Sequence, residues 1–111
     1  MRANLIAGQW TAGKQTNPDI NPSDVSDVID QYASGDAAAV DAAVAAARAA
    51  FPAWSGSTPQ QRFDALDFAG SEILARRAEL GELLAREEGK TLPEATGEAA
   101  RAGQIFKFFA G

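Results

Sequence analysis

The spacing of apolar residues changes near residue 35 of this 111-residue chain. Before that point, short runs rich in β-branched and aromatic residues are separated by glycine and by Asn-Pro pairs, which is typical of strands and turns. After it, apolar residues recur three or four positions apart, as they do along one face of an α-helix. The pattern therefore predicts short strands and turns over residues 1–33 and helices over residues 36–111.

The N-terminal part contains signals for short strands. Residues 4–11, with Gly8 at their centre, predict two strands joined by a tight turn. Asn17-Pro18 and Asn21-Pro22-Ser23-Asp24 are typical of turns, so we expect both to interrupt regular structure. Residues 27–33 are β-branched and aromatic enough for one more strand, which cannot bury both of its faces alone.

An alanine-rich segment predicts the first helix. Asp36 is a suitable N-cap for residues 37–51, because its side chain can accept a hydrogen bond from a backbone N–H of the first turn. The larger apolar residues form one narrow stripe, made of Val40, Val44 and Phe51 with Ala47 between them. Pro52 and Ser55-Gly56-Ser57 are expected to end this helix.

Two further helices follow from capping signals. Thr58-Pro59-Gln60-Gln61 has the capping-box pattern, with proline at the first helical position. Its helix is expected to end near Arg76-Arg77, whose charges suit a helix C-terminus. A shorter helix is expected to close at Gly89. The apolar faces of the two helices comprise Phe63, Leu66, Gly70, Ile73 and Leu74, and then Leu80, Leu83 and Leu84.

The last predicted helix has an unusual aromatic end. Thr91-Leu92-Pro93-Glu94 is a second capping-box signal, and the helix carries one common side made of Ala95, Ala99, Ala102, Ile105, Phe106 and Phe109. With Phe108, the aromatic residues cover more than one face, so they require burial on several sides. The chain has too few partners for that burial, and we expect an incomplete domain of a longer polypeptide. Alternatively, the aromatic end docks on the chain's own core or in a dimer.

Composition excludes several classes of function. The chain carries 10 Lys+Arg against 15 Asp+Glu, a net charge of −5, which disfavours nucleic acid as a partner. It has no Cys and no His, which excludes disulfides, Cys/His zinc sites and thiol or histidine catalysis by these residues. No apolar run approaches the ~20 residues of a membrane span, and the N-terminus lacks the apolar region of a signal peptide. We therefore expect a cytoplasmic location and no membrane association.

The local motifs carry little chemistry. Gly89-Lys90-Thr91 imitates the end of a phosphate-binding P-loop, but Leu84 stands where that motif needs its first glycine. No Gly-x-Gly dinucleotide fingerprint occurs. The acidic residues are expected to be solvated, because their spacing is wrong for a calcium loop and no apolar shell is evident around them. They are Asp24, Asp27 and Asp30, with Glu87, Glu88, Glu94 and Glu98 on the helices.

Arg101 is the one charged residue that suggests a site. It is surrounded in sequence by Ala99, Ala100, Ala102 and Gly103, so its long side chain can reach into a cavity and bind a carboxylate through two hydrogen bonds. The spacing alone favours a solvent-facing arginine.

Several stretches in a fixed order carry a family resemblance. They are Leu5-Ile6-Ala7-Gly8-Gln9-Trp10, Ile20-Asn21-Pro22-Ser23, residues 40–51, Glu87-Glu88-Gly89-Lys90 and Phe108-Phe109-Ala110-Gly111. From Asn4 onward the chain resembles the N-terminal segment of the aldehyde dehydrogenase superfamily. Residues 101–111 are most similar to the 2-oxoglutarate semialdehyde (2,5-dioxovalerate) dehydrogenase branch.

The resemblance implies an α/β fold for a protein several times this length. In this chain it implies a mainly α segment with short N-terminal strands, so that residues 1–111 form the N-terminal, incomplete part of a cofactor-binding domain. The implied reaction oxidises a small-molecule aldehyde, such as a carboxylated semialdehyde, to the acid with NAD or NADP. The catalytic Cys and Glu, the oxyanion-stabilising Asn and the cofactor-binding loops are expected beyond these residues. The remainder of the enzyme and a homo-oligomer are the expected partners.

The same resemblance suggests two binding roles within the chain. In some relatives a monovalent cation binds near the Asn-Pro turn and an acidic residue before Gly-Lys, and these positions match the backbone of Asp19 and Ile20 and the side chain of Glu87. Arg101 falls on a helix that borders the substrate tunnel in relatives, where it is expected to bind the distal carboxylate of a semialdehyde acid. The alternative is a non-catalytic helical interaction module that binds a partner through its aromatic C-terminal helix.

Overall fold

The computed structural model describes residues 1–111. Four short strands come first, followed by four helices that run almost to the C-terminus. In chain order the elements are β1 (Asn4–Ile6), β2 (Gln9–Thr11), β3 (Gln15–Ile20), β4 (Val28–Ser34), α1 (Ala37–Ser55), α2 (Pro59–Ala75), α3 (Arg77–Glu88) and α4 (Leu92–Ala110). The mainly α segment with short N-terminal strands that the sequence predicts is therefore confirmed.

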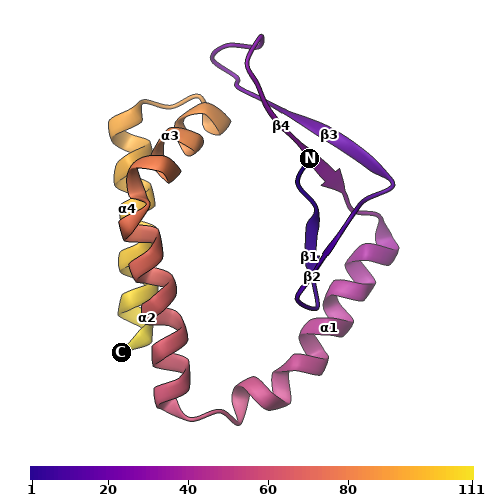
Figure 1. The fold of residues 1–111 in the computed structure, drawn as a ribbon, viewed down its shortest axis with the longest axis vertical. Helices are drawn as coiled ribbons and strands as arrows, with labels where there is room; N and C mark the ends of the chain where they lie inside the picture. The colour runs from indigo at the N-terminus through magenta and orange to yellow at the C-terminus, as the bar shows by residue number, and fades with distance from the viewer.

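The elements lie around an open ring instead of packing in layers about a core (Figure 1). The β1–β2 hairpin and α1 form one side, and α2 and α4 lie side by side on the other, with α3 packed on α4. The molecule measures 48 × 35 × 15 Å, and its radius of gyration of 16.7 Å exceeds the value of about 13 Å expected for a compact domain of this length. The fold is therefore flat and open.

The strands form two separate antiparallel hairpins. In the first, Leu5 pairs with Trp10, and Ala7 and Gly8 both have positive φ, as the favoured two-residue turn requires. In the second, β3 pairs with β4 along its whole length, so the predicted turn at Asn17-Pro18 is wrong. Each strand of a two-stranded sheet has a free edge, and proline is accommodated there without the loss of a ladder hydrogen bond. The predicted turn after Asn21 is confirmed.

The first helix begins as predicted but ends later. The Asp36 side chain accepts a hydrogen bond from the N–H of Ala39 and is paired with Lys14 at 2.9 Å. Pro52 lies inside α1, so its predicted role as the helix end is wrong. Its carbonyl accepts hydrogen bonds from the N–H of Gly56 and the hydroxyl of Ser55, so the turn that follows the proline is hydrogen-bonded.

The other helix ends follow local capping rules with one exception. Thr58 and Gln61 form the predicted capping box, and Arg77 donates a hydrogen bond to the carbonyl of Leu74 at the end of α2. Gly89 has a φ of 66° and closes α3 as predicted. Thr91 is the N-cap of α4, but its hydroxyl donates to the Glu94 carboxylate instead of accepting a backbone N–H, so the second capping box is incomplete.

Small residues allow α4 to approach α2 and α3 closely. Only five residues are buried, Gly70, Gly81, Ala95, Ala99 and Gly103, and none has a large side chain. A Cβ added to Gly103 would lie 2.7 Å from Leu74 Cγ, and one added to Gly81 would lie 2.5 Å from Thr96 Oγ1. These glycines are therefore required by packing.

The predicted apolar side of α4 is only partly correct. Ala95 and Ala99 are buried, but Gly103 continues that face, whereas Ala102 and the three large residues of the predicted side are exposed. Those large residues are Ile105, Phe106 and Phe109. Periodicity indicated the helix correctly but assigned the large side chains to the contact that small residues make.

Much apolar surface remains exposed. The accessible area is 7847 Å², whereas a compact monomer of this size exposes about 5,800 Å². Phe108 and Phe109 are 77% and 70% exposed and contact each other edge to face. The alternative in which the aromatic end docks on the chain's own core is therefore wrong.

Two glycines of α4 provide a matched test of this packing. Gly103→Ala adds a methyl group that clashes with Leu74 and the carbonyl of Gly70, at a cost of about 1–3 kcal/mol that exceeds the gain of about 1 kcal/mol in helix propensity. Gly97→Ala meets open space and gains the propensity alone. We expect the first variant to lower, and the second to raise, the urea concentration that halves the helical circular-dichroism signal. A rise for both variants would contradict the close α2–α4 contact.

Candidate functional site

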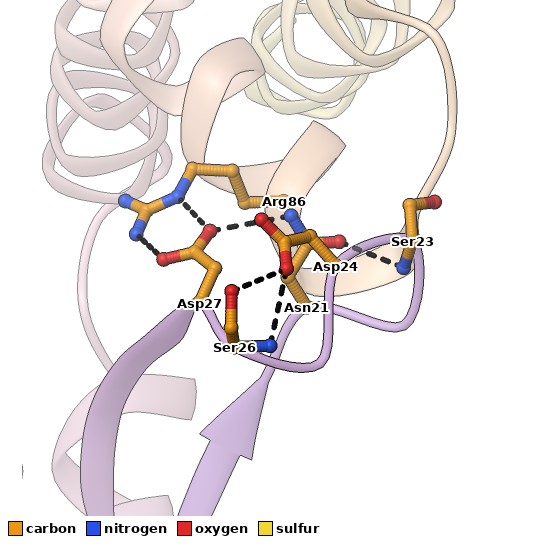
Figure 2. Close-up of polar contacts among 6 residues, drawn as sticks. All are labelled: Asn21, Ser23, Asp24, Ser26, Asp27 and Arg86. Atoms are coloured by element: carbon orange, nitrogen blue, oxygen red, sulfur yellow. Dashed lines mark hydrogen bonds and ion pairs between the residues drawn. The ribbon is translucent and has the colours of Figure 1, made fainter.

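Polar side chains gather where the free end of the β3–β4 hairpin meets the C-terminal end of α3 (Figure 2). Arg86, in the last turn of α3, donates from Nε to Asp27 Oδ2 at 2.9 Å and from Nη2 to Asp27 Oδ1 at 2.6 Å. Two parallel hydrogen bonds between a guanidinium and a carboxylate fix orientation as well as distance. The pair joins segments 59 residues apart in the sequence.

The turn that carries Asp27 is shaped by its own side chains. Asn21 Oδ1 accepts the N–H of Ser23 at 2.9 Å, and Asp24 Oδ1 accepts both the N–H and the hydroxyl of Ser26 (Figure 2). Asn21 Nδ2 also donates to Asp27 Oδ2 at 3.2 Å. Such Asx turns replace backbone hydrogen bonds and hold a loop in one conformation. The turn therefore presents Asp27 to Arg86 already oriented.

Hydrogen bonds from Arg86 and then Asn21 lower the pKa of Asp27 from its ordinary value of 3.8 to about 2. Asp30, on β4, has its pKa lowered to about 2 by the N–H of Gln31 and by the N-terminal ammonium of the chain. Both carboxylates were expected from the sequence to be solvated. They remain partly exposed, but each also has charged partners that the sequence did not indicate. Spacing along the chain does not reveal partners so distant in sequence.

Glu87 lies next to Arg86 and contacts the middle of the same hairpin. The Tyr32 hydroxyl donates to Glu87 Oε1 at 3.1 Å, and the Asp19 carboxylate lies near enough to Glu87 to repel its negative charge. Burial raises the pKa of Glu87, with Asp19 adding to the rise, and the hydrogen bond to Glu87 raises the pKa of Tyr32. The predicted exposed position of Glu87 is therefore wrong. Two neighbouring carboxylates attract a cation.

A third contact lies just beyond the end of α3. The Ser23 hydroxyl donates to the carbonyl of Gly89 at 3.1 Å. A Cβ on Gly89 would lie 2.7 Å from Ser23 Oγ and 2.8 Å from Pro22 Cγ, so both the positive φ and the close approach require glycine here. The hairpin is therefore attached to α3 at Arg86, Glu87 and Gly89.

The oxygen atoms at this junction are suitable ligands for a monovalent cation. The family resemblance predicted such a site from the backbone of Asp19 and Ile20 and from Glu87, and the structure places Asp19 near Glu87. Ile20 follows Asp19 at a β-bulge in which Ile29 is the extra residue of β4, so the ladder is locally disrupted beside these two residues. The negative end of the α3 dipole also favours a cation. No group of three acidic residues suited to a more highly charged metal occurs in the chain.

Arg101 and the hollows of the molecule offer less definite sites. Arg101 is exposed on α4 and takes part in none of the chain's ion pairs. A hollow of about 420 Å³ between α2, α3 and α4 is mostly apolar, with Glu87 and Glu98 among its lining residues. No glycine-rich dinucleotide fingerprint occurs in the chain. No helix has the length and apolar character that crossing a bilayer requires.

Sequence reasoning did not single out Arg86 or Tyr32. Arg86 follows three leucines on an ordinary helix, and Tyr32 belongs to a strand, so neither has a local signal. The clue available was the acidic character of the partner segments, since Asp19, Asp27 and Glu87 all need cationic or hydroxyl partners once buried.

Comparisons with known proteins agree with one another. The model of the aldehyde dehydrogenase family matches residues 10–111. Over 96% of its length the chain is 38% identical to an alpha-ketoglutarate semialdehyde dehydrogenase of Haloferax volcanii, and over 88% it is 41% identical to an N-succinylglutamate 5-semialdehyde dehydrogenase of Chromobacterium violaceum. It spans 22% and 20% of the lengths of these relatives.

Solved structures show the same fold. The chain is similar to a betaine aldehyde dehydrogenase of Staphylococcus aureus in complex with NAD+, with a TM-score of 0.93 and 30% identity over 99% of this chain and 23% of that one. It is also similar to an NAD-dependent benzaldehyde dehydrogenase of Corynebacterium glutamicum, with a TM-score of 0.91 and 33% identity over 98% of this chain and 24% of that one. The open arrangement of helices and hairpins therefore recurs in proteins about four times longer.

The Asp27–Arg86 pair makes a prediction about pH. Because pairing lowers the pKa of Asp27, the pair stabilises the folded arrangement above the ordinary value of 3.8 and is lost as the pH falls towards about 2. Carbon NMR of the Asp27 carboxyl in this chain is expected to show a titration midpoint near 2. Arg86→Gln is expected to shift that midpoint towards 3.8. An ordinary midpoint in the unaltered chain would contradict the pairing.

Proposed function

Because this chain belongs to the aldehyde dehydrogenase family, we propose that it supplies the N-terminal part of an enzyme that oxidises an aldehyde to a carboxylic acid with NAD or NADP. The observation that carries the proposal is the family match over residues 10–111. The chain spans about a fifth of the length of its curated relatives, so the activity belongs to the longer protein. The chain itself contains no cysteine to act as the nucleophile that the family uses.

In that enzyme, residues 1–111 serve as the incomplete first part of the cofactor-binding domain. Exposed Phe106, Phe108 and Phe109, together with the apolar hollow between α2, α3 and α4, supply surface for the remaining polypeptide to cover. The same surface would suit an interaction module, but the family match extends through the aromatic end, which favours the enzyme. Family membership alone also supports a homo-oligomer and a cytoplasmic location.

The proposed substrate is a semialdehyde that carries a carboxylate, such as 2-oxoglutarate semialdehyde. The names of both curated relatives refer to semialdehyde acids. Arg101 supports this substrate class because it is an exposed guanidinium that no carboxylate of the chain neutralises, and it leaves α4 between small residues. In this proposal Arg101 binds the distal carboxylate through paired hydrogen bonds.

The hairpin–α3 junction is proposed to hold a monovalent cation. Its ligands are the backbone of Asp19 and Ile20 and the carboxylate of Glu87. The proximity of the Asp19 and Glu87 carboxylates supports this role, because a bound cation reduces their mutual repulsion. The cation would hold the hairpin against α3 and take no part in the reaction.

The enzymatic proposal can be tested directly by an activity assay on the full-length protein. Purified enzyme is expected to reduce NAD or NADP with 2-oxoglutarate semialdehyde, with a higher kcat/KM than for an uncharged aldehyde of the same length. The measurement is the absorbance of the reduced cofactor. If no aldehyde supports cofactor reduction, the proposal fails.

Arg101→Ala tests the substrate class. The variant is expected to raise KM for the carboxylated aldehyde about tenfold to a hundredfold, because it removes hydrogen bonds to a charged group. KM for the uncharged aldehyde should change little. Arg48→Ala is the matched control, since Arg48 is an exposed arginine on α1 that forms no ion pair in the chain. Equal losses for the two aldehydes would refute the role of Arg101.

A further inference from the structure

One ion pair lies next to the proposed cation site without belonging to its proposed ligands. Asp19 and Ile20 lie on β3 and Glu87 lies on α3, so their relative placement depends on what attaches the hairpin to α3. The attachment at Gly89 is a single neutral hydrogen bond, and Tyr32 contacts Glu87 itself. Only the Asp27–Arg86 pair is both charged and bidentate.

We propose that Asp27 and Arg86 form a positioning pair that sets the geometry of the cation site without binding the cation. The proposal rests on the cation site proposed above. In this proposal Arg86 fixes the angle between α3 and the hairpin, and Asp27 holds the adjoining end of β3 in the orientation that results.

Asp27 lies next to the part of β3 that carries the proposed backbone ligands. Asp27 precedes Val28, and Val28 pairs with Ile20 immediately after the bulge in the ladder. The N–H of Asn21 also donates to the Asp27 carbonyl at 3.1 Å, which closes the turn next to Ile20. Fixing the Asp27 side chain on Arg86 therefore fixes the backbone of the residues that would supply carbonyl oxygens.

Arg86 lies next to a proposed ligand of the cation. Arg86 and Glu87 are neighbours in the last turn of α3, and both side chains reach the same hairpin, one at its turn and the other at its middle. The pair is half-buried, with exposed fractions of 40% for Arg86 and 28% for Asp27. Outer-sphere contacts of this kind orient ligands, and their loss typically weakens metal binding about 10–100-fold.

A second arginine–carboxylate pair, at the start of α3, is local in sequence. Arg76, the N-cap of α3, pairs with Glu79 three residues later, and their exposed fractions are 55% and 64%. They join no distant segments, so Arg76→Gln provides a control with the same chemical change next to the same helix.

The experiment measures sodium binding to the full-length protein by the line width of the sodium NMR signal, with choline chloride keeping the ionic strength constant. Arg86→Gln and Asp27→Asn are each expected to raise the apparent Kd about tenfold or more. The double variant is expected to be no worse than the weaker-binding single variant, because both changes break one link. Arg86→Lys keeps the positive charge but cannot form the two parallel hydrogen bonds of the guanidinium. Its Kd should therefore lie between those of the unaltered protein and Arg86→Gln. Arg76→Gln should bind as the unaltered protein does.

The two single variants separate positioning from simple electrostatics. Arg86→Gln leaves an extra negative charge near the site, and Asp27→Asn leaves an extra positive charge, so a purely electrostatic effect would tighten binding in the first and weaken it in the second. Weaker binding in both supports positioning. The thermal midpoint in choline chloride reports any general loss of stability, and a variant that loses stability there but keeps the sodium Kd would overturn the proposal.

The remaining outcomes are also decisive. Unchanged sodium affinity in both variants would overturn the positioning role while leaving the cation site intact. Absence of sodium binding in the unaltered protein would overturn the cation site and the positioning role together. Neither result affects aldehyde oxidation, which the cofactor-reduction assay measures separately.

Discussion

The close approach of α4 to α2 and α3 is the constraint on which the rest of the structure depends. It is made by glycine and alanine, and a methyl group at Gly103 or Gly81 would overlap the neighbouring helix. Contacts between small residues bring backbones together but bury little apolar area, and hydrophobic stabilisation scales with that area. Many of the larger apolar side chains are exposed, and the chain presents an apolar surface where a self-sufficient domain would have a core.

The hairpin–α3 junction differs from the helix contacts, because polar interactions join the two ends of the ring there. Arg86, Glu87 and Gly89 meet Asp27, Tyr32 and Ser23 in succession, so a short stretch of helix fixes a hairpin from the beginning of the chain. Asp19 and Glu87 lie near each other as a result. The geometry that supports a cation site is thus a consequence of long-range pairing and not of a local motif.

Local signals predicted the elements well, and long-range contacts account for what they missed. The Thr58 capping box, the turn at Gly8 and the end of α3 at Gly89 are determined by neighbouring residues, and all are confirmed. The strand through Pro18 and the extension of α1 past Pro52 depend on a free sheet edge and on local carbonyl partners. The charged partners of Asp27 and the surroundings of Glu87 come from distant segments, so no periodicity in the sequence could indicate them.

The most direct test of this account is the thermal melt of the 111-residue chain alone, followed by far-ultraviolet circular dichroism together with binding of a dye for apolar surface. If the outward-facing apolar side chains need further polypeptide to cover them, the chain shows a helical spectrum, a broad melt without a sharp midpoint and strong dye binding at low temperature. A monomer that melts in one sharp transition and binds no dye would contradict the account, because it would show that the chain completes its own core.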